Sequence, residues 1–146
     1  MAVSPSGLPQ LDVMAIRSGA SVCLVFAVPF SLAARWAADR PDGDGLAILL
    51  SLGAVCGFVV GSGVAAWVQR TGFPYVHSLI TASGTYLVAQ AVFIGARLVT
   101  GREVRWYAAL FNLTPVLFAG VLGGVLGNVL QRRGVVPGSR SGRGAG

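Results

Sequence analysis

The chain has 146 residues, of which 54% are hydrophobic and only 11% charged, and its mean hydropathy is +0.72. Because ordinary soluble domains are about a quarter charged, this composition excludes a conventional soluble domain and indicates a membrane protein. The two cysteines are too few for a disulfide framework.

Four uncharged stretches approach or exceed the roughly 20 residues that a membrane-spanning helix needs. They hold 17 residues between Arg17 and Arg35, 25 between Asp44 and Arg70, 26 between Arg70 and Arg97, and 26 between Arg105 and Arg132. We therefore predict an all-α membrane protein with four transmembrane helices in a compact bundle. The expected spans are about 16–36, 45–68, 76–98 and 106–130. Residues 1–15 would form an N-terminal segment, 16–130 the transmembrane domain, and 131–146 a disordered basic tail.

The first span has an alternative interpretation. A basic residue, a short apolar run and the small-residue pattern Ser31-Leu32-Ala33 also describe a cleavable signal peptide. Cleavage would leave three spans and would not change the rest of the topology. We expect the span to be retained.

The second span carries a row of small residues at a spacing of four: Gly53, Gly57, Gly61 and Ala65. In lipid, small residues at this spacing let helix backbones approach closely and gain van der Waals contact. The row therefore predicts a helix-packing surface.

Uncharged polar residues gather in the third span and early in the fourth: Ser83, Tyr86, Gln90, Asn112 and Thr114. One hypothesis is that they line a path or pocket for a small neutral or lipid-like solute. The other, which we favour, is that they form interhelical hydrogen bonds worth about 0.6 kcal/mol each. We expect His77 at the headgroup level beside Tyr75.

The fourth span is rich in glycine, at Gly120, Gly123, Gly124 and Gly127. A phosphate-binding loop would need a preceding strand and a water-accessible helix start. These glycines instead lie inside a 26-residue uncharged run. They predict a second helix-packing surface.

The two glycine-rich segments align when the chain is shifted by 62 residues. Gly61, Gln69, Arg70 and Gly72 then meet Gly123, Gln131, Arg132 and Gly134, and Arg35 meets Arg97. Residues 17–72 and 79–134 share 12 identities in 56 positions. The pattern suggests two helical hairpins related as parallel repeats.

The sequence lacks the residue patterns of proton-coupled transporters, of common hydrolases and of metal sites. No charged residue lies at the centre of a predicted span, where proton-coupled transporters usually keep one. Neither a GxSxG nor an HExxH motif occurs, and two cysteines with one histidine cannot form a recognisable metal site. We expect no enzyme and no cofactor, but a structural, accessory or assembly subunit. The alternative is a small channel or transporter for a neutral or lipid-like solute.

The arginines set the expected topology and partners. All eleven basic residues are arginine, a composition typical of GC-rich bacterial genomes, so we expect a bacterial plasma membrane. Arg70, Arg132 and Arg133 would anchor one face, with both termini cytoplasmic. Beside the lipid bilayer, we expect a homo-oligomer or a membrane-protein partner. Nucleic acid is not expected, because no aromatic residues alternate with the arginines of the tail.

Overall fold

The computed structural model describes residues 10–104 and 106–135, and its regular structure is entirely helical. The helices are α1 (Val13–Ala38), α2 (Asp44–Val68), α3 (Pro74–Val99) and α4 (Trp106–Arg132). Each contains a segment long and apolar enough to cross a membrane, and each predicted span lies inside the corresponding helix. The all-α prediction with four such helices is confirmed. Residues 1–9, Arg105 and the tail beyond residue 135 lie outside the described residues.

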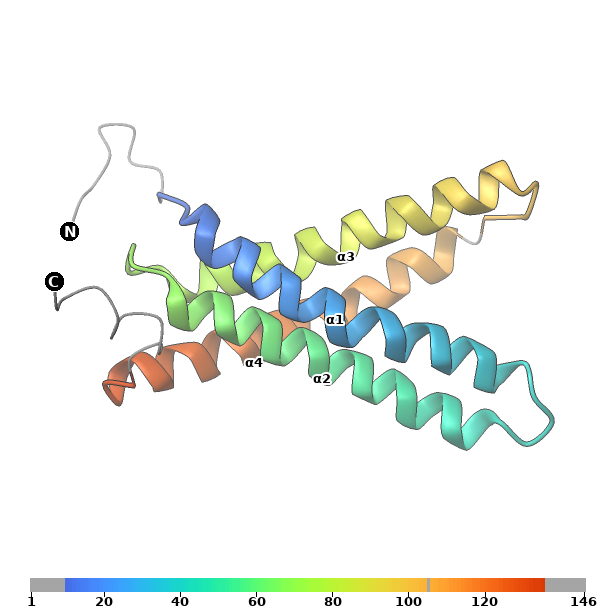
Figure 1. The fold of residues 1–146 in the computed structure, drawn as a ribbon, viewed down its shortest axis with the longest axis horizontal. Helices are drawn as coiled ribbons and strands as arrows, with labels where there is room; N and C mark the ends of the chain where they lie inside the picture. Colours follow the sequence, from blue (N-terminus) through green and yellow to red (C-terminus); the bar gives the residue numbers. More distant parts are fainter. Residues whose placement is uncertain (1–9, 105, 136–146) are drawn as a thin grey trace, which may run out of the picture.

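The helices run up and down in chain order (Figure 1). Helix α2 contacts the three others, whereas α1 and α4 do not contact each other within the described residues. The start of α1, the α2–α3 connection and the end of α4 lie at one end, which we call the converging end. At the opposite end the α1–α2 hairpin diverges from the α3–α4 hairpin, and we call this the splayed end. The bundle is therefore less uniformly compact than predicted.

Glycines bring the backbones together toward the converging end. A methyl group added to Gly61 would lie 2.7 Å from the Cys23 backbone nitrogen and 2.7 Å from the Gly19 carbonyl oxygen of α1. A methyl group added to Gly123 would lie 2.7 Å from the Gly63 nitrogen of α2. Since real side chains do not tolerate such distances to backbone atoms, only glycine permits these two contacts.

The other predicted packing residues also meet helices of the same chain. Gly53 and Gly57 lie against Phe30 and Phe26 of α1, and Ala65 lies beside Gly19. Gly120 and Gly124 face α3, while Gly127 faces α2 at Ala66. The fourth-span glycines thus serve two interfaces, with α2 and with α3.

The two hairpins match at the 62-residue offset found in the sequence. Shifting α1 and α2 by 62 gives 75–100 and 106–130, within one or two residues of the bounds of α3 and α4. Gly72 and Gly134, which follow α2 and α4, both have positive φ values of 81° and 68°. The paired glutamines Gln69 and Gln131 contact each other, with 3.4 Å between Nε2 and Oε1.

The buried side chains are smaller and more polar than the exposed ones. Among the described residues the buried side chains include many alanines together with Ser62, His77, Ser78, Thr81 and Thr85. Large apolar side chains such as Val88, Leu110 and Phe118 are more than 60% exposed. This distribution is the reverse of that in a water-soluble domain, where large apolar residues are the most often buried.

We predict that Gly61→Ala destabilises the bundle, because the added methyl group would collide with the α1 backbone. Overpacking of this kind costs about 1–3 kcal/mol, which should lower the unfolding temperature in mild detergent. The matched control is Gly84→Ala, since a methyl group there meets nothing within 4 Å. The control should gain up to about 1 kcal/mol from helix propensity. Equal stability of the two variants would contradict the close contact.

Candidate functional site

A cavity of about 410 Å³ lies between the two hairpins. Its lining comes from residues 24–38 of α1, 47–58 of α2, 85–93 of α3 and 112–116 of α4. These segments lie toward the splayed end, where the helices separate (Figure 1). Most of the lining is apolar, and it includes Leu24, Val28, Val55, Phe58, Phe93 and Val116. All four helices are therefore needed to build the cavity.

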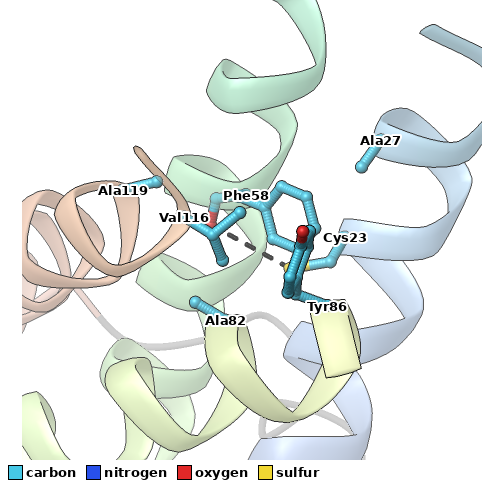
Figure 2. Close-up of a cluster of buried hydrophobic side chains, with 7 residues drawn as sticks. All are labelled: Cys23, Ala27, Phe58, Ala82, Tyr86, Val116 and Ala119. Atoms are coloured by element: carbon cyan, nitrogen blue, oxygen red, sulfur yellow. Dashed lines mark hydrogen bonds between the residues drawn. The ribbon is translucent and has the colours of Figure 1, made fainter. Parts of the chain in front are cut away.

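A cluster of buried side chains closes the cavity toward the converging end. Phe58 of α2 and Tyr86 of α3 meet edge to face, with ring centroids 6.5 Å apart and an interplanar angle of 64°. Figure 2 shows these rings beside Cys23 and Ala27 of α1 and Val116 of α4. The Cys23 thiol points toward the Phe58 carbonyl oxygen, 4.0 Å away. Side chains from all four helices thus pack where the cavity ends.

A hydrogen-bond chain crosses from α3 to α4 at the cavity wall. The Tyr86 hydroxyl donates to the Ala109 carbonyl oxygen at 2.5 Å. In turn, Gln90 Nε2 donates to the Tyr86 hydroxyl oxygen at 2.9 Å. Both side chains line the cavity. They therefore bond the helices together and also present polar atoms to the space between them.

Only some of the five predicted polar residues line the cavity. Tyr86, Gln90 and Asn112 line the cavity, whereas Ser83 and Thr114 do not. The Ser83 hydroxyl donates to the Leu79 carbonyl oxygen of its own helix at 2.6 Å, and Thr114 is exposed. Three of the five residues are thus placed where a solute could meet them.

Sequence reasoning missed four polar residues of the lining: Ser31, Arg35, Ser51 and Thr85. Arg35 is the only charged residue among the described residues that line the cavity. Its guanidinium carbon lies 5.4 Å from the centroid of the Phe93 ring, so a cation–π contact joins α1 to α3. The 62-residue alignment pairs Arg35 with Arg97 but does not indicate that Arg35 lines a cavity.

A second polar cluster lies at the converging end, around His77. This side chain is fully buried. Its Nε2 accepts a hydrogen bond from the Asp12 backbone N–H at 2.7 Å, and its Nδ1 lies 2.8 Å from the Phe73 carbonyl oxygen. The contacts fix the neutral tautomer with the proton on Nδ1. His77 therefore joins α3 to the start of α1. Its predicted position at the headgroup level stays a prediction.

The predicted anchors Arg70, Arg132 and Arg133 are exposed at the converging end. Beneath them Gln131 Nε2 donates to the Trp67 and Gln69 carbonyl oxygens at 2.9 and 3.1 Å. Gln69 in turn accepts hydrogen bonds from the backbone N–H groups of Thr71 and Gly72. These contacts hold the α2–α3 connection against the end of α4.

Within residues 10–104 and 106–135, no group of three or more His, Cys, Asp or Glu side chains is placed to hold a metal ion. Cys23 is buried and Cys56 is exposed, and both are free thiols. Comparison with protein-family models, curated proteins and solved structures finds no match to this chain. The geometry of the cavity therefore carries the functional interpretation.

We predict that Tyr86→Phe lowers stability, because it removes the hydrogen bond to Ala109 and leaves Gln90 without its acceptor. Interhelical hydrogen bonds in membrane proteins average about 0.6 kcal/mol and reach about 1.7 kcal/mol. Tyr107→Phe is the control, since Tyr107 is 86% exposed. Thermal unfolding in detergent should separate the two variants, and an unchanged unfolding temperature for Tyr86→Phe would count against the α3–α4 bond.

Proposed function

We propose that the chain is a multi-pass integral membrane protein built from a duplicated helical hairpin. Its apolar exterior and its interior of small and polar side chains support this, because lipid solvates the former and helix contacts satisfy the latter. The matching helix bounds and the paired glycines after α2 and α4 support the duplication. Two hairpins of the same orientation would be related by an axis along the membrane normal.

We further propose a bacterial plasma membrane with the converging end in the cytoplasm. The support is a small excess of exposed arginines, with Arg17, Arg70, Arg132 and Arg133 at the converging end against Arg35, Arg40 and Arg102 at the splayed end. The interface at the splayed end would be marked by Trp36 and Trp106, which are 57% and 61% exposed. Tryptophan is enriched at the headgroup level of membranes.

The orientation predicts which engineered cysteine reacts from which side. Thr71→Cys, in the α2–α3 connection, should react with a membrane-impermeant maleimide in inverted vesicles but not in intact spheroplasts. Asp39→Cys, in the α1–α2 connection, should show the opposite pattern. The unmodified chain controls for Cys23 and Cys56. Reversal of both patterns would place the termini outside.

We infer that the protein is not an enzyme and that it holds a lipid-like solute in the cavity between the hairpins. The carrying observation is the cavity itself. Its volume of about 410 Å³ falls in the range of about 300–1,000 Å³ typical of small-molecule sites. Its lining combines apolar side chains with the bonded Tyr86 and Gln90 pair, as expected for an amphipathic ligand.

An accessory or assembly role through the glycine surfaces is less well supported. All eight predicted packing residues lie at contacts inside the chain, so a homo-oligomer or a partner subunit would need another surface. Oligomerisation therefore stays a prediction. The cavity favours a solute-binding role.

We predict that filling the cavity lowers lipid binding. Ala89 lines the cavity, whereas Ala91, two residues further along α3, is exposed and does not line it. Ala89→Leu should reduce the amount of lipid that co-purifies with the protein in mild detergent, measured by native mass spectrometry. Ala91→Leu adds the same bulk to the same helix and should leave retention unchanged. Equal retention in both variants would contradict a solute site in the cavity.

A further inference from the structure

We propose that the occupant of the cavity is an anionic phospholipid of the surrounding bilayer, with its headgroup at Arg35 and one of its two acyl chains between the hairpins. This inference rests on the proposed solute-binding function and names the ligand class of the same site. It depends on the charge of the lining, the placement of Arg35 and the contrast with the equivalent arginine of the second hairpin.

The lining is suited to one anionic group attached to a hydrocarbon chain. Arg35 is the only charged residue among the described lining residues, although Asp39, Asp42 and Asp44 follow closely in sequence. The remaining lining is mainly apolar, with the polar atoms of Tyr86, Gln90 and Asn112 deeper along α3 and α4. A guanidinium can bind a phosphate in a bidentate manner, while the apolar lining matches the chemistry of an acyl chain.

Arg35 lies at the depth expected of a lipid headgroup. It occupies the last turn of α1, and the neighbouring Trp36 is 57% exposed. The Arg40 guanidinium carbon lies 3.4 Å from the centroid of the Trp36 ring. Aromatic and arginine side chains together mark the membrane interface. A lipid could therefore leave its headgroup at this level and direct its chain inward.

The contact of Arg35 with Phe93 places the charge across the opening between the hairpins. The guanidinium belongs to α1 and the ring to α3. A cation–π contact at an exposed site is worth only about 0.5–1 kcal/mol, so an anionic headgroup can compete for the guanidinium. The contact with Phe93 thus positions the Arg35 guanidinium at the cavity, and it uses none of the guanidinium N–H donors.

The aligned arginine of the second hairpin is used differently. Arg97 Nη1 donates to the Glu103 carbonyl oxygen at 3.0 Å and so ties its own connection. Arg97 does not line the cavity. The two arginines occupy equivalent positions in the repeat, yet only Arg35 is available to a ligand in the cavity. This makes Arg97 a matched control that removes the same charge at the same end.

The test uses the full chain in neutral detergent with phosphatidylglycerol and phosphatidylcholine of identical acyl chains. Native mass spectrometry measures which lipid stays bound. The wild type should prefer phosphatidylglycerol, and Arg35→Gln should reduce that preference about tenfold, the expected effect of losing a charge-assisted hydrogen bond. Arg35→Lys should keep part of it, because the positive charge remains. Arg97→Gln should leave it unchanged.

The outcomes distinguish this inference from the proposed function. Equal loss of preference in Arg35→Gln and Arg97→Gln would indicate attraction by net charge and overturn the assignment to Arg35. If Ala89→Leu lowers retention while Arg35→Gln keeps the wild-type preference, the cavity binds lipid but Arg35 does not select its headgroup. If neither substitution has an effect, both proposals fail. Unfolding temperatures of the variants exclude misfolding as the cause.

Discussion

The close approach of α2 to its neighbours at glycine is the constraint on which the rest of the architecture depends. Gly61 admits the α1 backbone, and Gly63 meets Gly123 of α4. In a membrane no hydrophobic force brings helices together, so packing distance decides their association. These contacts lie toward the converging end. Toward the splayed end, Phe30 lies against Gly53 in the α1–α2 hairpin, and Phe93 lines the cavity. The hairpins diverge toward this end, and the cavity lies between them.

The buried polar groups follow from the same arrangement. Small residues leave room for hydroxyl, imidazole and amide groups in the interior, and most of these bond to backbone carbonyls. Ser62 bonds to the Phe58 carbonyl oxygen at 2.6 Å within α2, while Tyr86 and His77 reach other segments. Thr81 is the exception, because its buried hydroxyl has no partner among the described residues. Polar bonds thus secure contacts that apolar packing alone would leave weak in lipid.

In the proposed duplication, residues that align between the two hairpins differ in their contacts. Gln69 and Gln131 still contact each other. Arg35 and Arg97 do not play the same part, since one lines the cavity and the other bonds to its own connection. Among the described residues, α2 and α3 each contact three helices, whereas α1 and α4 each contact two. The cavity therefore has one lining arginine among the described residues, although the two hairpins have similar helix bounds.

The sequence by itself determined the number of helices and their bounds to within about three residues, because uncharged length is a local property that the hydrocarbon thickness dictates. It also indicated which faces carry small residues, since i, i+4 spacing is fixed by helix geometry. Partner choice could not be read in this way: Gly120 and Gly123 are three residues apart but face α3 and α2. The cavity could not be predicted from the sequence either. Arg35 and Gln90 are 55 positions apart in the chain, and they line the same cavity only because the two hairpins pack together. Only the tertiary structure decided these points, because side chains from four helices meet according to the packing distances and crossing of their backbones.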